Sequence, residues 1–330
     1  MSEASQGGDA RRRGSARRLR WLTRRATKRA WQAVCRRLYV DRSQDVTDSI
    51  VVAGTARSGT TWIGSTIAGP TGAREIFEPF NTQRVPEARP FGEFPYRRAD
   101  EDDQALASFW RTILTGRIRG PWVDGYVDRL RPRGRVVKAV RANLMLAWMH
   151  RTFPAVPIVL VLRHPCAVAF SREQAGWNPD ADIHSILAQH RLVADHLQDV
   201  VDVIHRARTA AAKRAVIWCV QYRVPLRQLG PGSVVEAWYE HLCRDPQGEL
   251  PRLLAGLGVR WTPAVLERAN QPSAKALASS AVVTGDDKVE RWRSAMPPSD
   301  IDDVLSVVRE FGMDHLYDDS PLPRAASLFP

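Results

Sequence analysis

Short apolar runs alternate with stretches of helical spacing along most of this chain, from residue 49 onward. Runs rich in Val, Ile and Leu are typical of strands buried on both faces of a sheet. The predicted strands are Ile50–Ala53, Glu75–Phe77, Val136–Val140, Ile158–Leu162 and Val234–Ala237. The predicted helices are Thr61–Ala68, Asn143–Thr152, Cys166–Gln174 and a long one at Asp182–Arg206. This order predicts an α/β fold with a central parallel sheet, helices on its faces and ligands at the carboxyl ends of the strands.

A glycine-bracketed loop follows the first predicted strand and leads into a helical pattern. Its sequence, Gly54-x4-Gly59-Thr60-Thr61, has the spacing of a nucleotide-triphosphate loop, in which backbone N–H groups and a helix N-terminus bind phosphate. Thr60 stands where that loop has lysine, and Arg57 places a cation three residues earlier. The loop is therefore predicted to bind an activated nucleotide without the usual lysine contact.

A second polar element follows the strand predicted at Ile158–Leu162. Arg163 would lie at the carboxyl end of that strand, Pro165 suits the first turn of a helix, and Ser171 would lie about two turns along it. A guanidinium and a hydroxyl that converge at one point suit a phosphate monoester. Taken alone, Arg163 is equally consistent with a surface salt bridge.

Charge is concentrated at the N-terminus. The net charge is +12, but residues 1–40 carry twelve Lys or Arg and two acidic residues, which leaves +2 for the remainder. Residues 1–16 are predicted to be a disordered basic tail, and 17–40 a basic amphipathic helix. Such a helix suits peripheral contact with an anionic membrane, or it docks on its own domain. Because nucleic-acid binding would spread basic residues over the fold, no nucleic-acid partner is expected.

Cysteine spacing and hydropathy indicate the compartment. The four cysteines (Cys35, Cys166, Cys219 and Cys243) are far apart and fit reduced, buried thiols better than disulfides or a zinc site. No apolar run is long enough to cross a bilayer, and no export signal follows the arginine pairs. The prediction is a cytoplasmic protein, with any membrane association peripheral.

The two phosphate elements together resemble the sulfotransferase family that uses 3′-phosphoadenosine 5′-phosphosulfate, and most closely its carbohydrate-type and bacterial branch. The residues that carry the resemblance are Arg57-Ser58-Gly59-Thr60-Thr61, Phe77-Glu78-Pro79-Phe80, Arg163, Ser171, Tyr239-Glu240-His241-Leu242 and Asp245-Pro246. The resemblance covers residues 49–317, with 318–330 as a C-terminal tail. It implies a P-loop-like three-layer sandwich with helices on both faces of the sheet.

The resemblance also implies a site and a reaction. The 5′-phosphosulfate would be bound by the loop residues Arg57, Ser58, Gly59, Thr60 and Thr61 with Trp62 beside them, and the 3′-phosphate by Arg163 and Ser171. A sulfuryl group would pass in line to a hydroxyl of a carbohydrate, glycan or glycolipid acceptor, without a metal.

Three kinds of residue are candidates for the transfer itself. Arg57 would place positive charge at the transferring oxygens, helped by Lys138 or Arg141 at the end of another strand. Glu78, fixed by Pro79, is the candidate base for the acceptor hydroxyl; the alternatives are a structural carboxylate that accepts hydrogen bonds from loop amides, or one that positions the acceptor. Lys288, Arg291 and Arg293, around Trp292, are candidates for the loop that covers the donor in this family; the alternative is that they are solvated helix charges.

Two other functions are consistent with parts of the sequence. A small-molecule kinase on the same fold would use ATP, but it lacks the lysine at position 60 and an acidic residue for magnesium after Leu162. A binding module that uses the basic arm leaves both phosphate elements unexplained. The Pro- and charge-rich stretch 84–103 is predicted to be an insertion or lid loop. The sequence does not predict which acceptor is used, because acceptor pockets are built from loops.

Overall fold

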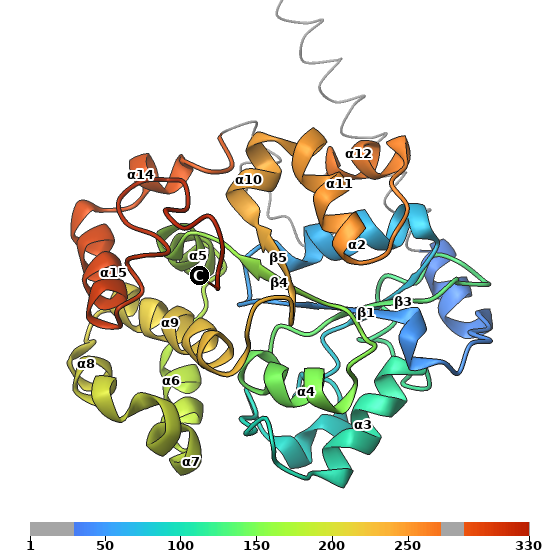
Figure 1. The fold of residues 1–330 in the computed structure, drawn as a ribbon, viewed down its shortest axis with the longest axis horizontal. Coiled ribbons are helices and arrows are strands. Elements are labelled where there is room, and N and C mark those ends of the chain that lie inside the picture. The colour runs from blue at the N-terminus through green and yellow to red at the C-terminus, as the bar shows by residue number, and fades with distance from the viewer. Residues whose placement is uncertain (1–29, 272–286, 330) are drawn as a thin grey trace, which may run out of the picture.

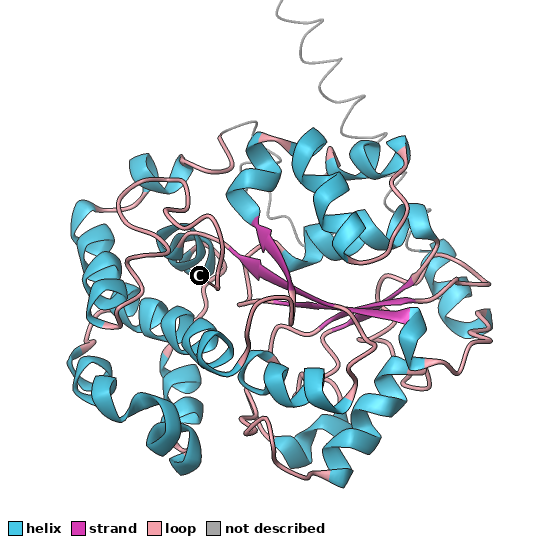
Figure 2. Ribbon diagram, in the orientation of Figure 1, coloured by secondary structure: helices cyan, strands magenta, loops and turns pink. Residues whose placement is uncertain are grey.

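The computed structural model describes residues 30–271 and 287–329. Its centre is a sheet of five parallel strands in the order β2-β3-β1-β4-β5, with helices on both faces (Figures 1 and 2). The strands are β1 (Ser49–Ala53), β2 (Arg74–Phe77), β3 (Arg135–Lys138), β4 (Ile158–Leu162) and β5 (Val235–Trp238). The predicted α/β, P-loop-like fold is confirmed, and each predicted strand is present to within two residues at either end.

The strand order positions the ligand site. The chain builds β2 and β3 on one side of β1 and then crosses to build β4 and β5 on the other side. A crevice therefore opens at the carboxyl end of β1, where the direction of the strand order reverses. The loop predicted to bind phosphate begins at this point.

The sheet separates two apolar clusters, as the two layers of helices in Figure 1 show. Val51 and Ala53 of β1 belong to one cluster and Val52 to the other, because successive side chains of a strand point to opposite faces. The helices on the Val52 face are α2 (Thr60–Thr71), α10 (Tyr239–Arg244), α11 (Pro246–Gly256) and α12 (Pro263–Ala269). The helices on the other face are α3 (Gln104–Leu114), α4 (Leu146–Thr152), α5 (Pro165–Glu173), α9 (Ala210–Gln228) and α15 (Pro298–Glu310).

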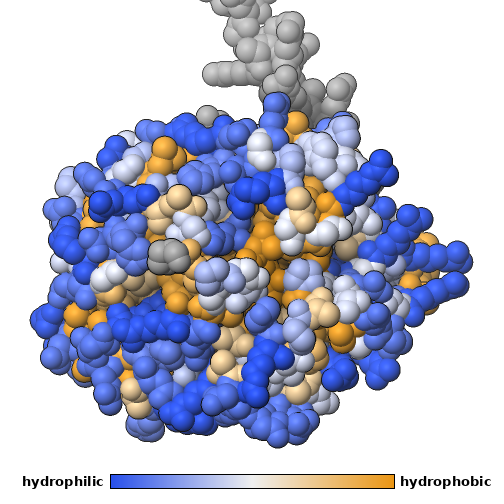
Figure 3. All heavy atoms as spheres, viewed as in Figure 1, coloured by the Kyte–Doolittle hydropathy of each residue, from blue (hydrophilic) through white to orange (hydrophobic). Residues whose placement is uncertain are grey.

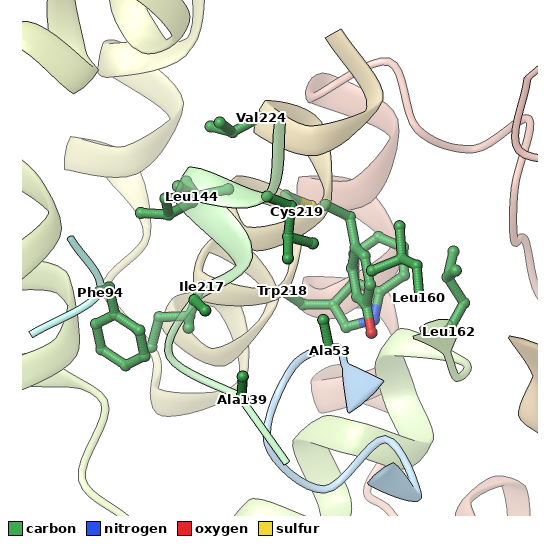
Figure 4. Packing of buried hydrophobic residues seen from close by; sticks show 14 of the residues in the cluster. Ala53, Phe94, Ala139, Leu144, Leu160, Leu162, Ile217, Trp218, Cys219 and Val224 are labelled. Atoms are coloured by element: carbon green, nitrogen blue, oxygen red, sulfur yellow. The ribbon is translucent and has the colours of Figure 1, made fainter. Parts of the chain in front are cut away.

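The longest of these helices, α9, has no counterpart among the predicted elements. Thirteen of its nineteen residues are buried, so its sequence lacks the one-sided apolar stripe that indicates a surface helix. Thr209 caps its first turn by accepting a hydrogen bond from the backbone N–H of Ala212. Figure 4 shows Trp218 and Cys219 of α9 in the same cluster as Leu160 of β4.

The predicted helix Asp182–Arg206 is wrong as a single element. It is divided into α6 (Asp180–Leu187), α7 (His190–Leu192), a π-helical turn (Val193–Leu197), a 3-10 turn (Gln198–Val200) and α8 (Val201–Arg206). The breaks are stabilised by contacts from distant segments. The side chain of Gln189 bonds the backbone of Phe94 and Tyr96 at 3.1 and 2.9 Å, and Arg223 donates to the carbonyl of His196. These partners lie about 95 and 27 residues away, so helical periodicity could not predict them.

The stretch 84–103 is packed rather than open. It forms a 3-10 turn (Pro86–Phe91), and Ala88, Phe94 and Tyr96 are buried in the main cluster. The hydroxyl of Tyr96 donates to Asp195 at 2.8 Å, which fixes the stretch to the divided helical segment.

Both ends of the described chain contact the domain. Residues 30–38 are helical, and Cys35 and Tyr39 pack with Val127; the predicted tail 1–16 and most of the helix 17–40 lie outside the described residues. At the other end, Glu236 of β5 accepts hydrogen bonds from the backbone N–H of Leu328 and the hydroxyl of Ser327. No helix in the described part of the chain is long and apolar enough to span a membrane.

Candidate functional site

The loop between β1 and α2 has a backbone that requires glycine at two positions. Gly54 and Gly59 have φ values of 141° and 100°. A Cβ atom would lie 2.5 Å from the carbonyl oxygen of Val161 at the first position, and 2.5 Å from the ring of Tyr239 at the second. Arg57 also has a positive φ, 77°. The loop is thus closely surrounded by β4 and α10, and its glycines cannot be replaced without displacing them.

Neighbouring elements hold this loop in place. The side chain of Asn143 accepts a hydrogen bond from the N–H of Gly54 at 3.0 Å. Arg172 of α5 donates to Thr55 Oγ1 at 2.6 Å and to the carbonyl oxygen of Ala56 at 3.3 Å. Burial lowers the pKa of Arg172 to about 10, which still leaves it charged at neutral pH. Arg172 therefore acts as an internal brace for the loop.

The structure brings the two predicted phosphate elements into direct contact. Arg57 Nε donates to Ser171 Oγ at 2.9 Å, across 114 residues of sequence. Arg163 Nη1 donates to the carbonyl oxygen of Arg57 at 3.1 Å, and its guanidinium lies 4.3 Å from the ring centre of Tyr239. The loop after β1, the end of β4 and the helix α5 thus meet at one point.

Arg57 and Arg163 have no carboxylate partner in the part of the chain that the structure describes. The buried Nε of Arg163 also has no hydrogen-bond partner among the described residues. Burial, and then the charge of Arg163, lower the pKa of Arg57. Two adjacent guanidinium groups that bury an unused donor are suited to an anion with several oxygens.

These residues line a cavity of about 660 Å³. The predicted site residues in its wall are Arg57, Gly59, Thr60, Thr61, Trp62, Glu78, Lys138, Arg163 and Ser171. Ser58 is the one predicted residue that does not line it; its side chain is fully buried behind the loop.

The lining of the cavity is strongly basic. It includes two carboxylates, Glu78 and Asp182, and eight basic side chains: Arg57, Arg84, Lys138, Arg141, Arg163, Arg172, Lys288 and Arg291. Since residues 41–330 carry a net charge of only +2, this concentration of positive charge is local to the cavity. It favours an anionic ligand with more than one charged group.

Glu78 lies at the end of β2, between two cations. Its Oε1 is 2.7 Å from Lys138 Nζ, and its Oε2 is 3.1 Å from Arg141 Nη1. Burial would raise the pKa of Glu78, but the charges and hydrogen bonds of Lys138 and Arg141 outweigh it and lower the pKa. Glu78 is therefore an ionised carboxylate at neutral pH, and its partners among the described residues are cations rather than loop amides.

Comparison with known proteins identifies the family. The sulfotransferase family model matches residues 49–263, which is more than half of the chain. The chain belongs to the sulfotransferase family. No match was found among curated proteins.

Solved structures that resemble the chain include two bacterial sulfotransferases. The sulfotransferase domain of the Synechococcus PCC 7002 olefin synthase is 18% identical with a TM-score of 0.44, over 80% of this chain and 94% of that one. The sulfotransferase STF9 from Mycobacterium avium is 12% identical with a TM-score of 0.42, over 85% of this chain and 79% of that one.

Several residues in the cavity of this sulfotransferase were not found from the sequence. Phe77, Phe94 and Trp122, called here the aromatic wall, add aromatic rings to the lining of the cavity, and the rings of Phe77 and Trp122 meet edge-on at 5.2 Å. They come from β2 and two separate loops, so no spacing links them. Arg84 lies over the ring of Trp122, at 5.6 Å from its centre.

The second carboxylate of the cavity, Asp182, was also missed. It lies in the first turn of α6, and burial raises its pKa against the opposing charges of Arg172 and Arg141. The sequence placed Asp182 at the start of a predicted helix, Asp182–Arg206, where an acidic residue is ordinary.

The sulfotransferase cavity is completed by the segment after residue 286. Arg163 Nη2 donates to the carbonyl oxygen of Lys288 at 3.3 Å, and the buried Trp292 stacks on His164 with ring centres 4.3 Å apart. Lys288, Arg291 and Trp292 line the cavity, whereas Arg293 does not. Within residues 30–271 and 287–329, no group of three or more His, Cys, Asp or Glu is arranged to hold a metal ion.

Proposed function

We propose that this sulfotransferase moves a sulfuryl group from 3′-phosphoadenosine 5′-phosphosulfate to a hydroxyl of a carbohydrate or glycolipid acceptor, without a metal. The observation that carries the donor assignment is the 2.9 Å hydrogen bond between Arg57 Nε and Ser171 Oγ. It joins two elements, each suited to a phosphate, in one basic cavity. A donor with anionic groups at both its 3′ and 5′ positions uses both elements, whereas ATP uses one.

The residues present fit this donor. The N–H groups of the loop and the start of α2, with Thr60 and Thr61, would hold the 5′-phosphosulfate. The close approach of Tyr239 and β4 to the two glycines keeps this backbone cradle in shape. Arg163 and Ser171 would hold the 3′-phosphate, for which the unused Nε of Arg163 is a ready donor. When bound, the donor supplies a sulfuryl group on a phosphate leaving group.

Glu78 would receive the proton of the acceptor hydroxyl. As that oxygen forms its bond to sulfur, the bond between sulfur and the 5′-phosphate oxygen breaks, and the electron pair leaves with the bisphosphate. Lys138 fixes the orientation of Glu78 at 2.7 Å and, with Arg57, adds positive charge near the reacting oxygens. Because the hydroxyl becomes acidic as its bond to sulfur forms, a carboxylate of low pKa suffices.

The aromatic wall supports a carbohydrate acceptor. Flat faces such as that of Trp122 pack against the C–H faces of sugar rings, and the polar side chains of Asn81 and Gln83 line the same cavity for hydroxyl groups. Lys138 Nζ lies 4.4 Å from the ring centre of Phe77 and 2.7 Å from Glu78 Oε1, which places this wall beside Glu78. An acceptor stacked there would present a hydroxyl to the base.

The direct test is transfer of radiolabel from the sulfuryl donor to a panel of oligosaccharides, glycolipids and phenols, with and without a chelator. The proposal predicts labelled carbohydrate products and an unchanged rate with the chelator. Label on phenols alone would contradict the acceptor assignment. Phosphate transfer from magnesium–ATP, with no sulfuryl transfer, would contradict the donor and favour the kinase.

A further inference from the structure

Exposed apolar side chains gather at one place on the surface. Among the described residues seven large apolar side chains are exposed, and five of them lie together around the N-terminal helix. These five, called here the N-terminal patch, are Trp31, Val34, Leu38, Val40 and Leu130, with exposed fractions of 47%, 43%, 62%, 51% and 38%. Such a concentration is unusual for a surface that faces only water.

The patch is held on a fixed backbone. Trp31, Val34 and Leu38 follow helical i, i+3, i+7 spacing, so they form one stripe along the helix of residues 30–38. The N–H of Val40 donates to the carbonyl oxygen of Leu130 at 2.8 Å, which places Leu130 alongside. Trp31 Nε1 donates to the carbonyl oxygen of Asp128 at 2.8 Å.

The helix is anchored beneath the patch. Cys35 and Tyr39 are buried against Val127, and the hydroxyl of Tyr39 donates to Asp124 at 3.2 Å. In the region where Figure 1 draws these first residues in blue, Figure 3 shows hydrophobic side chains among hydrophilic ones. The apolar stripe is thus exposed on a helix whose other side is already packed.

Basic residues lie on the same two segments of the chain as the N-terminal patch. The basic side chains on the same two segments are Arg36, Arg37, Arg42, Arg129, Arg131 and Arg133. None of them forms an ion pair within the described residues, and Asp128 is the exposed carboxylate among them. The nearby Asp41 is engaged by Arg135 at 2.7 Å. The preceding 29 residues of the sequence add ten more Lys or Arg and only two acidic residues.

We infer that the N-terminal patch binds the surface of an anionic lipid bilayer. An apolar stripe with an aromatic residue, on segments that also carry several arginines, matches the chemistry of acyl chains below acidic headgroups. A nucleic acid would use the arginines but gives aliphatic side chains such as Val34 and Leu38 no apolar partner. A second copy of the chain would bring two arginine-rich rims together, which like-charge repulsion opposes.

Co-sedimentation of the full-length protein with vesicles tests this inference without any assay of sulfotransfer. The vesicles contain phosphatidylcholine alone, or phosphatidylcholine mixed with phosphatidylglycerol. The test variant is Val34→Glu/Leu38→Glu. The matched control is Leu322→Glu, which changes an exposed apolar residue (39%) outside the patch. Thermal unfolding of each variant confirms that the fold is unchanged.

The wild type should bind the phosphatidylglycerol vesicles and not the neutral ones. The double variant should bind at least about tenfold more weakly, or about 1.4 kcal/mol, and Leu322→Glu should bind as the wild type does. Failure of the wild type to bind, or equal binding by the double variant, would overturn the inference. So would a dimer of the wild type that the double variant abolishes, or tighter binding to RNA than to vesicles.

Discussion

The proposed donor end of the cavity is built from one continuous loop and the residues that hold it, whereas the proposed acceptor end is assembled from side chains of separate segments. At the proposed donor end the groups available to a ligand would be mostly backbone N–H groups, in a loop shaped by Gly54 and Gly59, with Arg57 and Arg163 beside them. At the acceptor end, Phe77, Phe94 and Trp122 are brought together only by the fold.

This difference in construction determines which substitutions each end of the cavity tolerates. A backbone cradle depends on glycine and on strand order, so it requires a fixed spacing and suits one kind of donor. A wall of side chains from separate loops can change one residue at a time without disturbing the sheet. We therefore expect variants at the donor end to affect donor binding and transfer together, and variants of the aromatic wall to affect only the acceptor.

Glu78→Gln changes the proposed base, which lies where the donor and the acceptor would meet. Of the variants considered, it should lower the rate of transfer most. Glutamine keeps the size of the side chain but cannot take a proton, so transfer should slow by about 10²–10⁴-fold, with donor affinity retained. Steady-state kinetics and donor titration measure the two quantities. Glu93→Gln is the matched control, because Glu93 also binds Arg141, at 2.7 Å, but does not line the cavity. A rate for Glu78→Gln close to that of the wild type would remove Glu78 as the base.

Arg57→Ala tests the donor end. We expect a loss of about 10²–10³-fold in transfer, since a cation near the reacting oxygens is removed, together with weaker donor binding. The melting temperature should change little, because Arg57 faces the cavity and contacts the protein through one side-chain hydrogen bond to Ser171. Arg57→Lys keeps the positive charge but not the hydrogen-bond geometry to Ser171. Its rate of transfer should lie between those of the wild type and Arg57→Ala. Parallel losses of folding and activity would contradict this role.

Trp122→Ala tests whether the aromatic wall contributes to acceptor binding alone. Removing the flat face should raise the KM for the acceptor by about tenfold, the scale of one lost stacking contact. The donor dissociation constant should be unchanged. Trp122→Phe keeps a flat ring and should recover most of the loss. If donor affinity fell with Trp122→Ala, the division of the cavity into two independent ends would be wrong.

Asp182→Asn should have the smallest effect on transfer if Glu78 is the base, and the pH dependence separates the two carboxylates. A base must be ionised, and the pKa of Glu78 is lowered, so activity should persist as the pH falls through the ordinary range of glutamate. The pKa of Asp182 is raised, so a base at Asp182 would lose activity at higher pH. A large loss in Asp182→Asn, with the acidic limb abolished, would transfer the role to Asp182.

The lowered pKa of Glu78 also makes the stability of the fold depend on pH. Because the pKa of Glu78 is lower in the folded protein than in the unfolded chain, its ion pairs with Lys138 and Arg141 stabilise the fold above the unfolded pKa. This contribution is lost as the pH falls through the folded pKa. Glu78→Gln should therefore have a flatter dependence of unfolding free energy on pH in the acidic range than the wild type.

Features that depend on local spacing were predictable from the sequence, whereas features that depend on contacts between distant segments were not. The strands and the loop at Gly54–Thr61 depend on local spacing and on the rule that ligands bind at strand ends, so they were predictable. The hydrogen bond between that loop and Ser171 joins residues 114 apart and was not predicted. The helix α9 was not, because a helix buried on all sides has no periodic signal. The division of 180–206 depends on distant partners such as Gln189 with Phe94.

The most direct test is calorimetric titration of the protein with 3′-phosphoadenosine 5′-phosphate, compared with AMP and with magnesium–ATP. The bisphosphate should bind most tightly, with or without metal, and AMP should bind more weakly because it offers nothing to Arg163 and Ser171. Preference for magnesium–ATP over the bisphosphate would contradict the claim that the cavity is built for a sulfuryl donor.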